Sequence, residues 1–269
     1  MKIIASLVLY KHVYKDVEKT LFALLNEESI DKVCIVDNGN HCDWVKDLAH
    51  PKIEFIPLAK NRGFGSGHNA VFNQYRKRCE YVLICNPDIS FTRGQVDELY
   101  HYCQRRQCGL AIPKVVYPDG SLQHGCKLLP TPWQLFMRRF GASFSRGMNH
   151  SYELQQANYN TGFFAPSLSG CFMLISSEAL NAIGGFDERY FLYMEDVDLS
   201  RRVCTTNLPV EYCPSSTVVH ESQRRSYRDF TFLLYHITSA IKYFNKWGWL
   251  IDKEREALNS RCLSALPKK

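Results

Sequence analysis

Residues 81–88 read Tyr81-Val82-Leu83-Ile84-Cys85-Asn86-Pro87-Asp88, an apolar run followed directly by an acidic turn. A short apolar run bounded by a turn is typical of a buried strand. Similar apolar runs occupy residues 3–9, 33–36 and 53–58. The first third of the chain is therefore predicted to supply several buried strands.

Helical patterns lie between these runs. Residues 16–25 place Val17, Leu21 and Leu24 on one stripe, and further helices are expected at about 66–78 and 95–106. Strands separated by helices predict parallel βαβ units with right-handed crossovers. The expected fold class is therefore α/β, with a mostly parallel central sheet flanked by helices.

The second half of the chain is less regular. From about residue 122 to 167 the sequence is polar and aromatic without a clear period, and so long a connection in a compact domain is usually functional or mobile. The remaining core is expected to comprise strands at 115–117, 170–175 and 210–219 and helices at 177–183 and 196–204.

The composition is that of a globular protein with a sizeable core: 269 residues, 45% of them hydrophobic and 22% charged. A net charge of +6 permits contact with an anionic surface or a phosphorylated ligand, but does not indicate a nucleic-acid-binding protein. The 11 cysteines are odd in number and residues 1–10 do not read as a signal peptide, which predicts free thiols in a reducing cytoplasm. No stretch approaches the roughly 20 apolar residues of a membrane span.

Acidic side chains follow two of the predicted strands: Asp37 with Asn38 follows the second, and Asp88 with Asn86 follows the fourth. Open α/β sheets bind ligands at the carboxyl ends of their strands, where a nucleotide site would lie. A carboxylate at that edge can hold a divalent cation on a diphosphate. A turn that merely closes the strand explains Asn86-Pro87-Asp88 equally well.

His220 ends a β-branched run that is expected to form a later strand. A lone histidine is more often structural than a metal ligand. Paired with Asp88 across the sheet, it would complete a mixed oxygen and nitrogen site, which favours Mn²⁺ over Mg²⁺.

Glu195, Asp196 and Asp198 form a cluster of carboxylates after an aromatic run. Such a cluster is unfavourable unless a cation or a proton-transfer role offsets the repulsion. Acidic side chains in the first turn of a helix interact favourably with the helix dipole, which explains one or two of these three carboxylates. An apolar wall raises the pKa of a carboxylate and makes it a better general base. Asp198 lies two positions from Asp196, so a structural role facing Arg201 or Arg202 is expected for it.

Residues 61–69, Asn-Arg-Gly-Phe-Gly-Ser-Gly-His-Asn, join a strand to a helix. They match neither the phosphate-binding loop nor the dinucleotide fingerprint. The glycines indicate a close approach of the backbone to a ligand or to another element, with tight helix–sheet packing as the alternative.

The C-terminal stretch mixes basic and aromatic residues at helical spacing, beginning with Arg224, Arg225 and Arg228. Most such stripes face a protein core. Lysine, arginine and interfacial aromatic residues together also suit docking on an anionic membrane surface.

These motifs together resemble the family 2 glycosyltransferases, in particular the bacterial rhamnosyltransferase-like branch that builds O-antigen and related polysaccharides. The resemblance runs from Ile3 to about His220. Its most specific part is the order Gly185-Phe186-Asp187-Glu188, Phe191, Tyr193, Glu195-Asp196, Asp198-Leu199 and Arg202. It implies a GT-A nucleotide-sugar-binding fold, an inverting single-displacement mechanism and a C-terminal helical extension.

The resemblance also implies roles for individual residues. Asp37 would read the pyrimidine base of the donor, and Asp88 would hold Mn²⁺ or Mg²⁺ on the diphosphate with His220 as a further ligand. Asp196 would take the proton from the acceptor hydroxyl, with Glu195 shaping the site. Asn86 stands in place of the first aspartate of the family's acidic turn, a substitution usual in this branch. The nucleotide sugar is further expected to contact Asn38, Asn61, Arg62, Gly63, Gly67, Asn69, Asn86 and Gly170.

The implied organisation is a catalytic domain over 1–222, with its nucleotide-binding half over about 1–110 and its acceptor half over about 111–222. An amphipathic helical segment over 223–269 follows. The implied partners are a dTDP- or UDP-sugar donor and a lipid-linked saccharide acceptor, with peripheral contact of the C-terminal segment on the inner face of the plasma membrane and no nucleic acid. L-Rhamnose from dTDP-rhamnose is the first choice. UDP-galactose, UDP-galactofuranose and UDP-N-acetylglucosamine stay open, because sugar choice depends on the shape of the pocket.

Two other classes of protein fit the sequence less well. A nucleotidyltransferase would share the strand–helix pattern, but the chain lacks a basic glycine-rich N-terminal signature and Glu195-Asp196 would have no function there. A catalytically silent scaffold subunit of a polysaccharide assembly complex would not require Asp88, Asp196 and His220, all of which are present.

Overall fold

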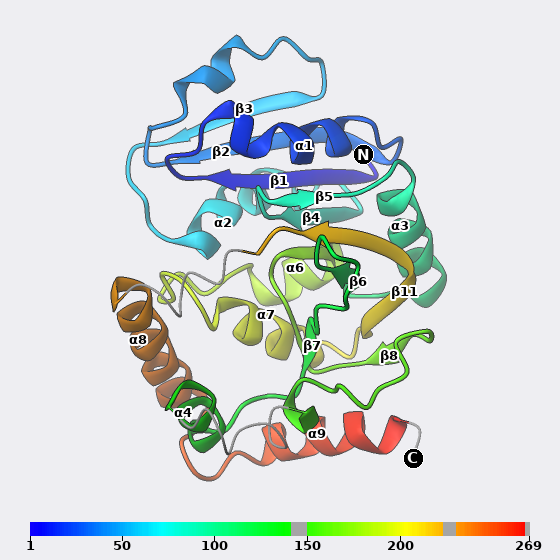
Figure 1. Ribbon diagram of the computed structural model, residues 1–269, viewed down its shortest axis with the longest axis vertical. Coiled ribbons are helices and arrows are strands. Elements are labelled where there is room, and N and C mark those ends of the chain that lie inside the picture. Colours follow the sequence, from blue (N-terminus) through cyan, green and yellow to red (C-terminus); the bar gives the residue numbers. More distant parts are fainter. Residues whose placement is uncertain (141–149, 223–229, 267–269) are drawn as a thin grey trace.

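A central sheet of nine strands organises the residues that this computed structural model describes, 1–140, 150–222 and 230–266 (Figure 1). From one edge to the other the strands are β3 (Ile53–Leu58), β2 (Ile30–Asn38), β1 (Ile3–Leu9), β4 (Tyr81–Cys85), β10 (Phe172–Ser176), β6 (Leu110–Val116), β11 (Val210–His220) and β5 (Ile89–Ser90), and β8 (Phe163–Phe164) pairs with β11.

The first four of these strands are parallel, as the sequence predicts. β1 pairs with β2 and with β4, so that Leu9 lies opposite Asp37 and Leu7 opposite Cys85. Parallel strands covered by helices on both faces are apolar throughout, which is why these runs lack a polar alternation. Beyond β4 the direction changes: β10 is antiparallel to β4 and β6, whereas β11 is parallel to β6. The mostly parallel sheet is confirmed, and β10 and the two-residue strands β5 and β8 are antiparallel additions to it.

Helices cover both faces of the sheet. Because side chains alternate along a strand, Ile3 and Leu7 of β1 enter one core and Ile4 enters the other. The first core is covered by α1 (Tyr14–Leu25) and α3 (Gln95–Arg106), and the second by α2 (Phe64–Tyr75), α6 (Ser177–Ile183) and α7 (Glu195–Cys204).

The predicted helices at 95–106 and 177–183 have the expected bounds. α2 begins at Phe64 rather than at residue 66, because its N-terminal boundary is Gly63, whose φ of +100° only glycine adopts without strain.

The aperiodic region from 122 to 167 contains short elements. They are β7 (Cys126–Lys127) and α4 (Pro132–Phe140), besides β8, and β7 pairs with β9 (Ser167–Leu168). A 3₁₀ turn, η1 (Asp43–Asp47), precedes β3. Residues 141–149 of this region lie outside the described parts of the chain.

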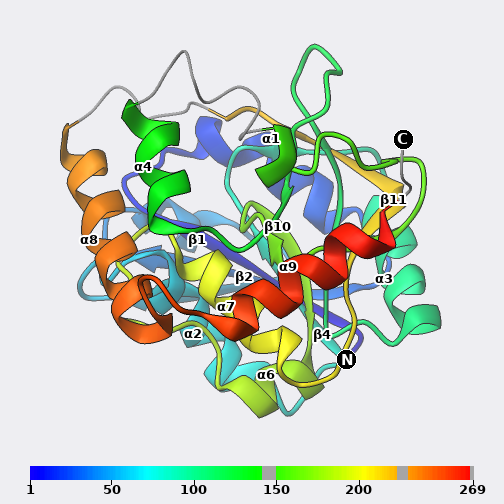
Figure 2. The same ribbon diagram turned by 90° about the horizontal axis from the view of Figure 1, so that it is seen from below.

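The C-terminal segment forms α8 (Phe230–Trp247) and α9 (Lys253–Ala265), at the opposite end of the molecule from α1 (Figures 1 and 2). The basic residues predicted at its start, Arg224, Arg225 and Arg228, lie outside the described residues. Within the described ranges, no helix combines the length and the apolar character needed to cross a membrane. The division of the chain at residue 222 stays a prediction.

Buried charges on α7 join the C-terminal helices to the core. Arg201 is 1% exposed, and its guanidinium group forms a two-pronged ion pair with Asp252, with N–O distances of 2.6 and 2.7 Å. Asp198 is fully buried and pairs with Lys246 of α8 at 2.7 Å, while Trp247 donates its indole N–H to the same carboxylate. Buried charges need such partners, so α7 specifies how α8 and α9 pack.

The Asp252→Asn variant tests the buried pair. Asparagine keeps the shape of the side chain and an oxygen that can accept the cap hydrogen bond from the Arg255 N–H, but it leaves the Arg201 charge without its buried counterion. We expect the free energy of unfolding in urea to fall by about 3 kcal/mol.

Glu254→Gln is the matched control, because Glu254 contacts the same guanidinium group but its side chain is 41% exposed. This variant should lose about 1 kcal/mol or less. Equal losses in the two variants would contradict the assignment of the buried pair as the stabilising contact.

Candidate active site

The candidate site lies where β4 ends and β10 begins. The antiparallel pairing places Phe172 opposite Cys85, and the N–H of Asn86 donates to the carbonyl oxygen of Cys171 at 2.8 Å. The turn after β4 is therefore held against Gly170 and Cys171, the two residues that precede β10. Residues predicted from distant motifs converge at this point.

Asp88 and His220 face each other across the sheet, as the sequence-based pairing requires. His220 Nε2 lies 3.3 Å from Asp88 Oδ1, because β11 pairs with β5 and brings His220 opposite Ile89. His220 Nδ1 contacts Gln123 Oε1 at 3.0 Å. The Asp88 side chain keeps 30% of its surface exposed, so the pair can be reached from solvent.

Each member of this pair shifts the protonation of the other. Burial alone lowers the pKa of His220, but hydrogen bonds to Asp88 and Cys171 outweigh it and raise the pKa to about 10. Burial alone raises the pKa of Asp88, but the neighbouring His220 holds it below its usual value. An imidazolium offers no lone pair, so His220 would have to lose its proton before it could bind a cation.

The donor atoms here fit a divalent cation only in part. Asp88 Oδ1 is buried, with His220 Nε2 as its ion-pair partner at 3.3 Å, and a carboxylate oxygen beside an imidazole nitrogen suits Mn²⁺. Among those same residues, no group of three or more histidine, cysteine, aspartate or glutamate side chains is arranged to hold a metal ion. Asp88 and His220 would thus supply two ligands, and the remaining ones would have to come from a diphosphate and water.

Asp196 is held beside this turn by Gly170. Its Oδ2 accepts from the Gly170 N–H at 3.0 Å, and its Oδ1 accepts from the N–H of Val197 at 2.8 Å. A Cβ atom on Gly170 would lie 3.1 Å from the Cβ of Asp196, so a side chain there would crowd the carboxylate. Gly170 and Cys171 therefore connect Asp196 to Asn86 and to the Asp88–His220 pair.

Glu195 differs from its neighbour in environment. Its side chain is buried, and Glu195 Oε2 has no hydrogen-bond partner among the described residues. Burial, and then the negative charge of Asp196, raise the pKa of Glu195 well above its usual value. Burial thus favours the neutral form of Glu195 beside Asp196.

The backbone before these two carboxylates is strained. Tyr193 and Met194 have φ values of 68° and 66°, in the left-handed region that non-glycine residues rarely enter. α8 supports this turn: Ser239 Oγ donates to the Leu192 carbonyl oxygen at 2.8 Å, and the rings of Tyr193 and His236 lie 5.3 Å apart. Strain of this kind persists only where the surroundings enforce it.

Asp198 has the structural role expected from its spacing. Its Oδ2 pairs with Arg202 Nε at 2.7 Å, one turn along α7. Its other oxygen faces Lys246 and Trp247 of α8, away from Asp196.

Asp37 and its neighbours form a second polar cluster, at the end of β2. Asp37 is fully buried, and its two oxygens accept from the N–H groups of His41 at 3.0 Å and Cys42 at 2.7 Å. Asn38 donates to Asn61 Oδ1 at 3.1 Å and to the Gly63 carbonyl oxygen at 2.9 Å. These contacts brace the loop that carries Arg62, and a contact with the donor stays a prediction.

The glycine-rich turn approaches other protein elements closely. A Cβ atom on Gly63 would lie 2.2 Å from the Phe191 carbonyl oxygen, and one on Gly67 would lie 2.7 Å from Val8 Cγ1. The side-chain amide of Asn69 bonds to the backbone of Phe186 and to Glu188. Packing between elements thus explains Gly63, Gly67 and Asn69 without a ligand.

Sequence reasoning missed two residues that contact His220. Gln123 lies in the aperiodic region, where no pattern marked it. Cys171 falls within the strand expected at 170–175, and nothing in the sequence distinguishes it there, although it adjoins Gly170. Their role depends on strand pairing over long sequence separations, for which a single sequence holds no signal.

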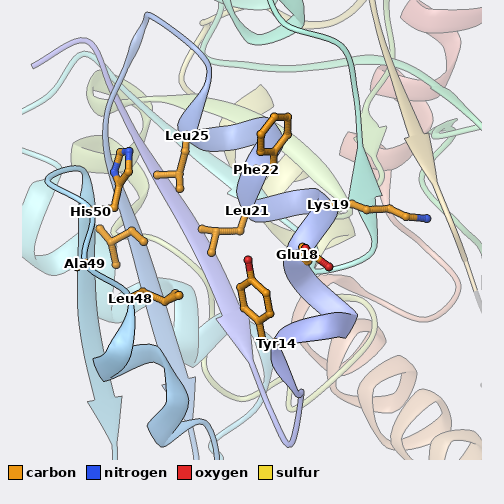
Figure 3. A pocket seen from close by; sticks show the side chains of 10 residues that line it. Tyr14, Glu18, Lys19, Leu21, Phe22, Leu25, Leu48, Ala49 and His50 are labelled. Carbon is orange, nitrogen blue, oxygen red and sulfur yellow. The ribbon is translucent and has the colours of Figure 1, made fainter.

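A separate pocket lies between α1 and the segment before β3 (Figure 3). Its volume is about 390 Å³, and Tyr14, Leu21, Phe22, Leu48 and His50 are among its lining residues. No residue predicted for the active site lines it.

Known proteins share this chain's sequence pattern. The family model described as glycosyl transferase family 2 matches residues 7–183, and that of glycosyl transferase family group 2 matches residues 120–250. The N-acetylglucosaminyl-diphospho-decaprenol L-rhamnosyltransferase of Mycobacterium tuberculosis is 29% identical over 216 residues, which cover 73% of this chain and 68% of that protein. The rhamnosyltransferase WbbL of Escherichia coli K12 is 22% identical over 265 residues, 94% of this chain and 97% of that protein.

A solved structure shares the fold. The crystal structure of GalNAc-T7 with UDP, GalNAc and Mn²⁺ aligns with a TM-score of 0.67 at 12% identity, over 99% of this chain. The chain spans only about half, 52%, of that longer protein. The common fold is that of GT-A glycosyltransferases, and with the match to the family model it shows that this chain belongs to glycosyl transferase family 2, as a glycosyltransferase of the rhamnosyltransferase-like type.

Proposed function

We propose that the protein is an inverting, metal-dependent glycosyltransferase that moves a sugar from a nucleotide diphosphate onto a lipid-linked saccharide. The first choice of sugar is L-rhamnose from dTDP-rhamnose, used in bacterial O-antigen or related cell-surface polysaccharide synthesis. The observation that carries the proposal is the Gly170–Cys171 turn, which sets the Asp196 carboxylate beside the strand end where Asp88 faces His220.

In the proposed reaction Asp196 is the general base. The acceptor oxygen forms a bond to the anomeric carbon as the bond from that carbon to the diphosphate breaks, and the hydroxyl proton passes to Asp196. The Gly170 N–H orients the carboxylate of Asp196, and the raised pKa of Glu195 favours the neutral form of that neighbour. A divalent cation bound by Asp88 and His220 would neutralise the charge that develops on the diphosphate.

Asp37 is proposed to read the pyrimidine base. Each of its oxygens already accepts one backbone hydrogen bond, and a carboxylate oxygen can accept two, so each keeps a lone pair for a base N–H. Because Asp37 is fully buried, the base would reach it only after the residues that cover it move. Asn38, Asn61 and Arg62 would border the same donor.

The relatives support the choice of substrates. The name of the M. tuberculosis relative states rhamnosyl transfer to a decaprenol-linked acceptor, and the E. coli relative is also a rhamnosyltransferase. The UDP and GalNAc in the solved structure support a UDP-sugar as the alternative donor. We place the reaction at the inner face of the plasma membrane, with peripheral contact through the C-terminal segment.

The Asp196→Asn variant tests the base. Asparagine can keep the contact with the Gly170 N–H but cannot take a proton, so the rate of sugar transfer should fall by about a thousandfold or more. The affinity for the nucleotide should stay nearly unchanged, since the base acts on the acceptor.

Glu195→Gln is the companion variant, because glutamine resembles the neutral glutamic acid. Its loss of transfer should be smaller than that of Asp196→Asn by a factor of about ten at least. Loss of donor binding in Asp196→Asn, or a greater loss of transfer in Glu195→Gln, would refute this assignment.

A thermal-shift panel tests the donor and the metal together. dTDP, UDP and GDP are each added with Mn²⁺ and with a chelator. At a concentration about a hundredfold above Kd, selective binding should raise Tm by about 5 °C or more. A metal-dependent shift with dTDP supports the rhamnosyl donor, and one with UDP supports the alternative.

Asp88→Ala serves as the control in the same panel. It should remove the metal-dependent part of the shift. If Asp88→Ala keeps the full metal-dependent shift, the metal site lies elsewhere.

A further inference from the structure

α8 is apolar on two opposite sides. Its inner side buries Ser239 and Tyr243, and Tyr243 lies in a cluster with Tyr190 and Met194. Its outer side exposes Phe230, Leu234, Ile237 and Ile241, which follow the spacing of a single helical stripe. Packing on the core explains the inner side, whereas the described residues leave the outer side open to solvent.

The exposed apolar surface continues beyond α8. α4 packs Leu135 against the same inner cluster and exposes Trp133 and Phe136. The loop that follows α8 exposes Leu250 and Ile251, which are 86% and 81% exposed. Figures 1 and 2 both show α4 beside α8. We call the outward side chains of α4, α8 and residues 249–251 the α4–α8 surface. Exposed apolar side chains gathered on neighbouring elements are typical of an interaction site.

The charges of these elements favour one class of partner. The charged residues of α4, α8 and 248–251 are Arg138, Arg139, Lys242 and Lys246, and no aspartate or glutamate is among them. Glu153 and Asp198 neutralise Arg138 and Lys246, so apolar contact supplies the main attraction. An apolar stripe with tryptophans and cations, carried by elements that themselves contain no carboxylate, fits the interface of an anionic bilayer.

The helix that carries this surface contacts the turn that precedes Asp196. α8 touches the turn before α7 through the pair of rings Phe191 and Tyr235, whose centroids are 4.7 Å apart, and through the bond from Ser239 to Leu192. Asp196 follows that turn directly. A bilayer on the outer side of α8 would therefore adjoin the part of the site that receives the acceptor.

We propose that the α4–α8 surface docks on an anionic phospholipid bilayer, with Trp133, Phe136, Leu250 and Ile251 inserted at the interface. The docking would hold the Asp196 side of the site near saccharides that a lipid anchors in the same membrane. The link to the acceptor rests on the proposed function, but the docking itself requires neither donor nor acceptor.

Sedimentation with lipid vesicles tests the docking. The full chain is mixed with vesicles of equal parts phosphatidylglycerol and phosphatidylcholine, and with vesicles of phosphatidylcholine alone. We expect the chain to bind the anionic vesicles more strongly than the vesicles of phosphatidylcholine alone. The double variant Leu250→Ser/Ile251→Ser should bind at least about tenfold more weakly, because two large apolar side chains no longer enter the interface.

Phe22→Ser is the matched control. Phe22 is 71% exposed on α1, beside the pocket of Figure 3 and at the other end of the molecule. This variant should bind vesicles like the unmodified chain. Both sites are exposed, so neither substitution should change Tm appreciably.

Four results would overturn the proposal. Three of them are absence of binding by the unmodified chain, equal binding by the double variant, and equal weakening by Phe22→Ser. The fourth is a concentration-dependent dimer that the double variant abolishes, which would make a second copy the occupant. The nucleotide thermal shift of the double variant should be unchanged, so a failed docking test leaves the donor site separately measurable.

Discussion

The pairing of β10 with the end of β4 is the interaction on which the site depends. It holds Cys171 against Asn86, and from that point Gly170 reaches Asp196 while Cys171 reaches His220. Because side chains alternate along a strand, a slip of one residue in this pairing would turn Phe172 and its neighbours to the wrong face. The register of this one strand pair therefore determines both the position of the Asp196 carboxylate on α7 and that of the Asp88–His220 pair.

The same helix that begins with Glu195 and Asp196 also carries the deepest charges of the fold. Asp198 and Arg201 are buried, and their partners Lys246 and Asp252 come from the C-terminal segment. Burying an unpaired charge is unfavourable by several kcal/mol, so alternative packings of α8 and α9 are disfavoured. The C-terminal helices thereby restrict the orientation of α7 and of the residues at its start.

Much of the fold could be predicted because its signals are local. The bounds of α3 and α6 follow from periodicity within a dozen residues, and the parallel β1–β4 units follow from uninterrupted apolar runs. The direction of β10 could not be predicted, because strand direction depends on partners far away in the sequence. Among the candidate residues, Asp88 and His220 meet as their positions at strand ends suggested. The aromatic run predicts a carboxylate with a raised pKa, but which carboxylate it is, Glu195, depends on burial that no motif encodes. The same holds for the backbone contacts of Asp37.

The left-handed turn at Tyr193 and Met194 has a consequence for how this protein can be stabilised. Each such non-glycine residue costs roughly 1–3 kcal/mol, and glycine would relieve that strain. However, the buried Met194 packs in the cluster with α8 and the Tyr193 ring lies beside that of His236, so glycine would also free the turn from the helix that holds it. Loss of a buried methionine side chain costs about 2–5 kcal/mol, as much as or more than the strain that glycine would relieve. Relaxing the turn at Met194 would therefore loosen the segment that precedes Asp196 without making the fold more stable.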